Sequence, residues 1–172
     1  KRFDAMDKRL DAMDKRFDGI DKRLDRMDDS IGVLKGAHAR NAALGNAALI
    51  AHDLGFSKTR ILPQDELISL VQSRTVADIP RNERRSFLNA DLIMEAVDQD
   101  GQVCYVAAEI SFTVDERDTR RARRNAALLT RFTGKRADAV VAGMSKDQRI
   151  QGIIETGDVF WYQLEAEDVE VD

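Results

Sequence analysis

Cysteine is almost absent from this chain, whose 172 residues contain one, Cys104. A single thiol excludes an internal disulfide framework and a zinc site built on cysteines. Cys104 stands in an apolar run between Val103 and Tyr105, which is typical of a buried and inert thiol. The two histidines, His38 and His52, lack acidic or cysteine partners at ligand spacing, so we expect no metal site at either.

Other signals are missing as well. No stretch approaches the roughly 18 consecutive apolar residues of a membrane span, and the first residues lack the apolar core of a signal peptide. The sequence has no G-x-x-x-x-G-K phosphate loop and no Ser-His-Asp arrangement. These absences predict a cytoplasmic protein without membrane association and argue against nucleotide-loop and serine-hydrolase chemistry.

The chain has little net charge, but some segments carry a strong excess of one sign. The formal net charge is -4, yet residues 116–136 hold eight Arg or Lys against two acids, and the last ten residues hold five acids and no base. Local charge therefore says more about partners than the net value does.

The first 35 residues repeat with a period of seven, reading KRFDAMD, KRLDAMD, KRFDGID and KRLDRMD. Apolar residues recur at alternating spacings of three and four from Phe3 to Leu34, which is the a/d seam of a left-handed coiled coil. We therefore predict a coiled-coil oligomerisation helix over residues 1–35.

The charges that flank this seam predict its orientation. Arginines at g positions, such as Arg16, would face aspartates at e positions five residues further on, such as Asp21, only in a parallel, in-register partner. Exposed pairs of this kind set orientation more than stability. A parallel homodimer through residues 3–34 is the favoured assembly, with a trimer or tetramer left open.

Residues 36–172 show the mixed pattern of an α/β domain. Ala-rich residues 42–54 and residues 64–73 predict helices, and residues 75–86 predict a loop or irregular helix. Two β-rich runs, 87–97 and 102–113, joined by Asp-Gly, predict a hairpin. An arginine-rich helix over 115–133, a strand over 137–142, a helix over 146–156 and a strand over 159–164 follow. This order predicts a mixed sheet with helices on both faces.

Two acids interrupt the apolar strands of this hairpin, Asp91 and Glu109. Neighbouring antiparallel strands can bring them together, and adjacent carboxylates in a dry setting repel unless a hard divalent cation such as Mg²⁺ neutralises them. Such an ion can activate water for phosphodiester hydrolysis. Pairing of each acid with an arginine is the alternative. Glu95 either completes the cluster or faces solvent.

Asp91, seventeen intervening residues, Glu109-Ile110-Ser111 and a following basic helix together resemble the PD-(D/E)XK nuclease superfamily. The stretch from Glu109 to Leu129 also resembles a group of bacterial proteins that join a coiled coil to a nuclease-like domain. This resemblance implies a restriction-endonuclease-like α-β-β-β-α-β core over residues 36–172, with Asp91 and Glu109 as metal ligands. Ser111 stands where the motif has its catalytic lysine, and a hydroxyl cannot replace that positive charge.

The resemblance and the basic helix lead to two functional hypotheses. One is a coiled-coil-oligomerised, Mg²⁺-dependent nuclease with Asp91, Glu109 and Ser111 at its catalytic position. The alternative is an inactive nucleic-acid-binding or scaffold module on the same fold. In both, Arg120, Arg121, Arg123 and Arg124 are the candidates for binding DNA or RNA phosphates without sequence preference.

Overall fold

The computed structural model describes residues 2–72 and 78–165, and the chain divides into two compact units, Lys1–Ala37 and His38–Asp172. The first unit is formed by one helix, α1 (Arg2–Gly45), whose last turns belong to the second unit. We expected the helical pattern to change near residue 35. The helix instead continues to Gly45, because the alanine-rich sequence after residue 36 retains high helix propensity. The short helix α2 (Ala47–Asp53) follows.

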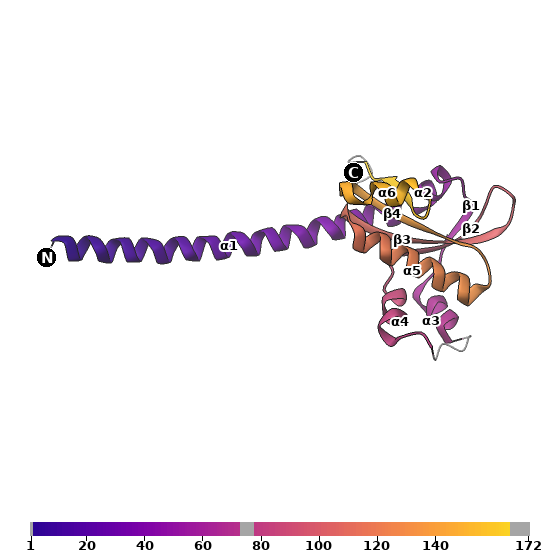
Figure 1. The fold of residues 1–172 in the computed structure, drawn as a ribbon, viewed down its shortest axis with the longest axis horizontal. Coiled ribbons are helices and arrows are strands. Elements are labelled where there is room, and N and C mark those ends of the chain that lie inside the picture. Colours follow the sequence, from indigo (N-terminus) through magenta and orange to yellow (C-terminus); the bar gives the residue numbers. More distant parts are fainter. Residues whose placement is uncertain (1, 73–77, 166–172) are drawn as a thin grey trace. The chain divides into compact units, whose positions relative to one another are not determined.

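The second unit is built on a five-stranded sheet in which the strands pair in chain order (Figure 1). The strands are β1 (Ser57–Ile61), β2 (Leu92–Val97), β3 (Val103–Val114), β4 (Ala137–Lys146) and β5 (Phe160–Gln163). β2 is antiparallel to both β1 and β3, whereas the pairs β3–β4 and β4–β5 are parallel. This arrangement confirms the prediction of a mixed sheet with helices in an α/β unit.

The hairpin β2–β3 is the feature that positions the candidate site. Its turn contains Gly101 with a φ of 77°, a left-handed conformation that glycine adopts without strain. The prediction that Phe87 begins the first strand is wrong. Phe87 is instead a buried residue of helix α4 (Arg81–Leu88), in which Arg81 and Arg85 are exposed.

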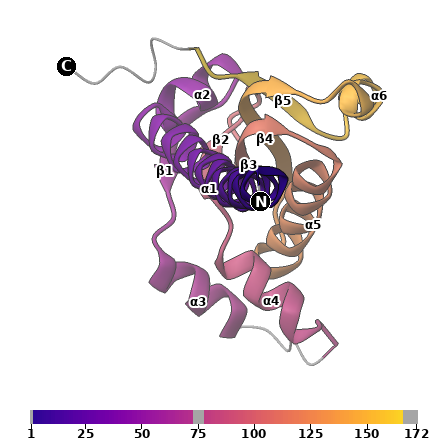
Figure 2. The ribbon, with the colours of Figure 1, turned by 90° about the vertical axis from the view of Figure 1, so that its left-hand side faces the viewer.

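The helices cover the sheet in two layers (Figure 2). One layer contains α3 (Gln64–Gln72), α4, α5 (Glu116–Thr133), the 3-10 turn η1 (Gln148–Ile150) and α6 (Gln151–Glu155), and its core includes Leu67, Phe87, Leu129 and Ile150. The other contains residues 38–45 of α1 and all of α2, with Ala43 and Ile50 in its core. β3 and β4 are central and buried on both faces.

Helix α5 has well-defined ends, which fix the register of its side chains. The side chain of Asp115 accepts hydrogen bonds from the backbone N–H groups of Arg117 and Asp118, and the Asp118 carboxylate accepts one from the backbone N–H of Asp115, which completes a capping box. Gly134, with a φ of 71°, ends the helix in the left-handed conformation. The predicted helix over 115–133 therefore has the expected limits.

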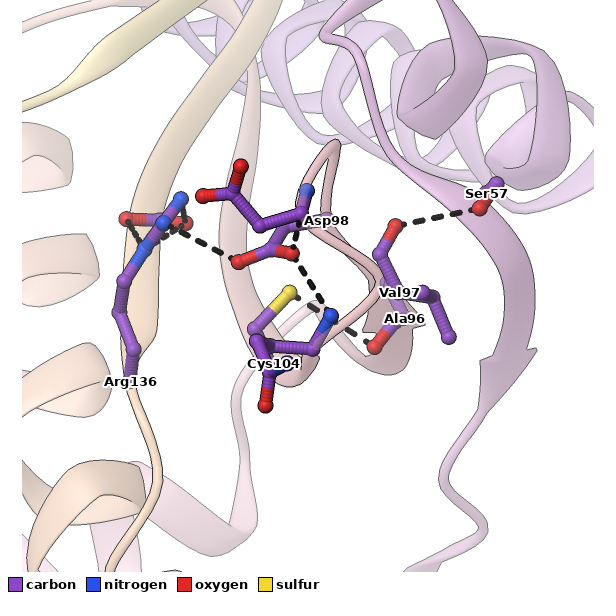
Figure 3. Close-up of polar contacts among 9 residues, drawn as sticks. Ser57, Ala96, Val97, Asp98, Cys104 and Arg136 are labelled. Carbon is purple, nitrogen blue, oxygen red and sulfur yellow. Dashed lines mark hydrogen bonds and ion pairs between the residues drawn. The ribbon is translucent and has the colours of Figure 1, made fainter.

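Cys104 is buried, as predicted, and burial raises the pKa of its thiol. It lies near the turn end of the hairpin, where its Sγ contacts the carbonyl oxygen of Ala96 at 3.6 Å (Figure 3). No helix in the described part of the chain combines the length and apolar character that crossing a bilayer requires.

Candidate functional site

The antiparallel register of β2 and β3 brings Asp91 and Glu109 together at the end of the hairpin opposite its turn. Leu92 pairs with Ala108, so Asp91, just before Leu92, meets Glu109, just after Ala108. The negative charge of Asp91 therefore acts directly on the Glu109 carboxyl group. The structure thus creates the close acid pair that the sequence predicts.

Glu109 is a completely buried acid, with 1% of its surface exposed. Its Oε1 accepts a hydrogen bond of 2.7 Å from Asn125 Nδ2, and its Oε2 lies 2.8 Å from Arg121 Nη2. Although Arg121 is close, its contact does not have hydrogen-bond geometry, and Oε2 has no hydrogen-bond partner among the described residues. Arg121 therefore compensates Oε2 through charge rather than through a directed hydrogen bond.

Burial and a like-charged neighbour raise the pKa of Glu109 to about 8. Loss of hydration is the largest cause and the negative charge of Asp91 the second, while Arg121 acts in the opposite direction. Because the two carboxyl groups interact strongly, the proton belongs to the pair rather than to one residue. At neutral pH the acid pair therefore holds a proton that a cation could replace.

Asp91 is held in place by two donors. Arg40 Nε lies 2.7 Å from its Oδ1, and the backbone N–H of Ile110 donates to its Oδ2 at 2.9 Å. The Asp91 side chain is 7% exposed, whereas that of Arg40 is 48% exposed. A partly exposed arginine therefore covers an almost buried acid.

Asp118 and Asn125 belong to this site although the sequence analysis did not single them out. Asp118 interacts electrostatically with Asp91, Glu109 and Arg121, and burial raises the pKa of its carboxyl group. Asp118, Arg121 and Asn125 are spaced by three and four residues along α5 and so share one helix face. That spacing was the available signal, and α5 turns this face toward Glu109.

Ser111 and Glu95 do not join the acid pair. The Ser111 hydroxyl donates to the carbonyl oxygen of Thr113 at 3.0 Å. Glu95 accepts a hydrogen bond of 3.0 Å from the Tyr105 hydroxyl and lies 3.7 Å from Arg60. Of the two options for Glu95, the structure thus supports neither full exposure nor membership of the cluster.

The four arginines proposed as one nucleic-acid surface have different surroundings. Arg121 turns toward Glu109 and its side chain is 28% exposed. Arg124 is half-buried and donates to the Ser86 hydroxyl of α4. Arg123 is more exposed and lies 3.5 Å from Asp158, and Arg120 is exposed. The helix therefore separates one arginine for the acid pair from three that point elsewhere.

Carboxylates are the side chains that hard divalent cations prefer, and the acid pair supplies two of them. No cluster of three or more His, Cys, Asp or Glu able to hold a metal occurs within residues 2–72 and 78–165. Mg²⁺ is often held by only one or two carboxylates, with water and substrate phosphates completing its shell. Asp91 and Glu109 equal that number of carboxylates, and in this structure Arg40 and Arg121 lie 2.7 and 2.8 Å from them.

Comparisons with known proteins give no further guidance, since no family model, curated protein or solved structure matches the chain.

Proposed function

We propose that the His38–Asp172 unit is a nuclease-like module that hydrolyses phosphodiester bonds with a divalent cation bound by Asp91 and Glu109. The observation that carries the proposal is the buried acid pair. Glu109 is 1% exposed, lies beside the like-charged Asp91 and has a pKa near 8, which is an expensive arrangement for stability alone. Strongly perturbed acids of this kind cluster at functional sites.

The side chains around the pair suggest a role for each residue. When bound, Mg²⁺ would supply Lewis-acid stabilisation of the phosphate and lower the pKa of a water ligand. Asn125 orients the Glu109 carboxylate through its 2.7 Å hydrogen bond, and the Ile110 N–H orients Asp91. Arg121 supplies, from α5, the positive charge that Ser111 cannot provide from β3.

The order of the elements also supports this proposal. A helix, three strands, a helix and a strand occur in the order α2, β1, β2, β3, α5, β4, as expected from the resemblance to PD-(D/E)XK nucleases. α3 and α4 are inserted between β1 and β2. The candidate acids lie at the start of β2 and within β3, where the resemblance places its metal ligands.

A cleavage assay tests the proposal. Labelled single- and double-stranded DNA and RNA are incubated with the full chain in Mg²⁺, Mn²⁺ or EDTA. We expect cation-dependent cleavage that Glu109→Gln lowers by at least a hundredfold, in line with the loss of one key charged group. Glu95→Gln is the matched control, because it makes the same change in the same hairpin, and it should cleave normally. Cleavage that persists in Glu109→Gln would refute the proposal.

A specific observation favours the second candidate, an inactive nucleic-acid-binding or scaffold module. Arg40 and Arg121 already compensate Asp91 and Glu109 at 2.7 and 2.8 Å, so the pair can persist without a cation. The same assay separates the candidates, since this module would bind nucleic acid in salt-sensitive fashion without turnover in any cation.

We further propose that the Lys1–Ala37 unit makes the protein a parallel homo-oligomer, with a dimer as the expected form. The seam residues from Met6 to Leu34 are between 44% and 67% exposed in the single chain. The exposed set is Met6, Leu10, Met13, Phe17, Ile20, Leu24, Met27, Ile31 and Leu34. A heptad-spaced apolar stripe of this length is the surface that a second identical helix buries.

Mass measurement in solution tests the assembly. Met13→Glu with Ile20→Glu places charges in the seam and should give the monomer mass by light scattering. Ala12→Glu with Gly19→Glu makes the same charge change at the preceding positions, outside the seam, and should remain oligomeric. Equal masses for the two double variants would contradict the proposed interface.

A further inference from the structure

A groove lies along the outer side of α5, next to α6, and three arginines line it. Its volume is about 480 Å³, within the range of about 300–1,000 Å³ typical of ligand sites. Its lining residues are Glu116, Thr119, Arg120, Arg123, Arg124 and Ile153. Figure 2 shows α5 and α6 as neighbouring helices on the same side of the sheet.

The groove is positively charged and only loosely neutralised. Three guanidinium groups face one lining carboxylate, that of Glu116. Arg120 has no ion pair or hydrogen bond within the described residues. The Arg123 contact with Asp158 is long, at 3.5 Å, and both side chains are 54% exposed, so water screens it strongly.

Arg124 adds a buried donor that lacks an acceptor. Its Nη2 donates to the Ser86 hydroxyl, but its Nε is buried and has no hydrogen-bond partner within the described part of the chain. Arg124 nevertheless lines the groove, so it adds a third guanidinium charge to those of Arg120 and Arg123.

We propose that this groove binds the phosphate backbone of a nucleic acid, with Arg120, Arg123 and Arg124 as the contacts. The inference rests on the proposed function, because it assigns the substrate of that module to a surface separate from the acid pair. Helix α5 connects the two places. Its Arg121 turns to Glu109, so a nucleic-acid strand bound in the groove would lie along the same helix that contacts the acid pair. Three guanidinium groups along one groove match the regularly repeated charges of a phosphodiester chain, whose oxygens arginine binds through two parallel N–H donors.

Fluorescence anisotropy with a labelled oligonucleotide in EDTA, where cation-dependent cleavage does not occur, tests the groove. We expect Arg120→Gln with Arg123→Gln to weaken binding about tenfold or more at low salt, and to lower the slope of log K against log salt by about two. Arg81→Gln with Arg85→Gln removes the same charge from exposed positions of α4 and should change both quantities little. Circular dichroism should show that both variants remain folded.

The outcomes distinguish this inference from the proposed function. Two results would overturn the groove as the nucleic-acid site. One is a groove variant with wild-type affinity and salt slope, and the other is an equal loss of affinity in the α4 control. Binding of a labelled phosphopeptide in preference to the oligonucleotide would also overturn it. Glu109→Gln should retain oligonucleotide binding in EDTA, so a failure of hydrolysis with binding intact refutes only the catalytic proposal.

Discussion

The two ends of the β2–β3 hairpin use the same residue types in opposite ways. At the turn, Asp98 accepts hydrogen bonds from the backbone of Asp100 and Gln102 at 3.0 and 2.9 Å, and its Oδ2 lies 3.4 Å from Arg136 (Figure 3). Arg136 is 56% exposed and is also held by Asp138 at 2.7 Å. Each Asp98 oxygen thus has a donor. The contacts of Asp98 and Arg136 are therefore accounted for by their role in stabilising the turn.

At the other end, two acids are buried side by side and one Glu109 oxygen lacks a hydrogen bond. The comparison teaches that an arginine beside an acid does not by itself indicate a site. Burial of like charges together, with a raised pKa and an unsatisfied oxygen, is what separates the candidate site from the structural cluster.

The largest expected effect is a difference in pH dependence between these ends. Below pH 4.5 the Glu109 carboxyl group is protonated in both the folded and the unfolded chain. Between that value and about 8, only the folded chain keeps the proton, so the free energy of unfolding decreases as pH rises and levels off above about 8. Denaturant unfolding in EDTA should show this decrease, on the order of a few kcal/mol, in wild type. Glu109→Gln should keep only the part due to Asp118, whose pKa burial also raises.

Asp98→Asn serves as the control for that experiment, because it changes an acid at the turn end of the same hairpin. It should keep the wild-type decrease. If Glu109→Gln retains the full wild-type decrease in unfolding free energy, another group holds the proton. The acid pair would then not differ from the turn end of the hairpin in the way described.

A smaller effect is expected when the arginine at each end is replaced. Arg121→Met leaves the buried Glu109 carboxyl group without its cation, which should raise the pKa of Glu109 further and cost about 2 kcal/mol in unfolding free energy. Arg136→Met should cost less, about 1 kcal/mol, because Arg136 itself is 56% exposed and water can take its place beside Asp98 and Asp138. Equal losses of unfolding free energy in urea for the two variants would show that the two arginines contribute equally, against this expectation.

The smallest effect concerns the turn itself. Asp98→Ala removes the acceptor for the Asp100 and Gln102 N–H groups, which water can replace in part, and should cost about 1 kcal/mol. Thermal unfolding at neutral pH should show this loss. A loss as large as that of Arg121→Met would contradict the lower energetic weight given to the turn.

The sequence predicts best what depends on local pattern. The heptads predict a long helix, the Asp-Gly turn predicts the hairpin, and Asp115 with Gly134 predicts the limits of α5. The register that brings Asp91 to Glu109 also follows locally, because a tight turn fixes strand pairing. The exception is Phe87, where an apolar residue after RNERRS is the buried side of a helix rather than the start of a strand.

Contacts between residues far apart in the chain could not be predicted from the sequence. Arg40 reaches Asp91 across 51 positions, and no local pattern marks it among the 27 basic residues. The separation of Arg121 from Arg120 and Arg123 depends on which face of α5 packs on β3, and that is set by the tertiary core around Ala122 and Leu129. A charged run therefore predicts a basic helix but not the partner of each charge.

The most direct test of the account is Mn²⁺ binding to the full chain, measured by calorimetry or paramagnetic resonance at pH 6.5 and pH 8.5. Because the ion must displace the proton held by the acid pair, wild type should bind more tightly at the higher pH and release a proton on binding. Glu109→Gln should lose this binding, and Glu95→Gln should retain it. Absence of binding to wild type, or equal binding by Glu109→Gln, would contradict the assignment of Asp91 and Glu109 as a cation site.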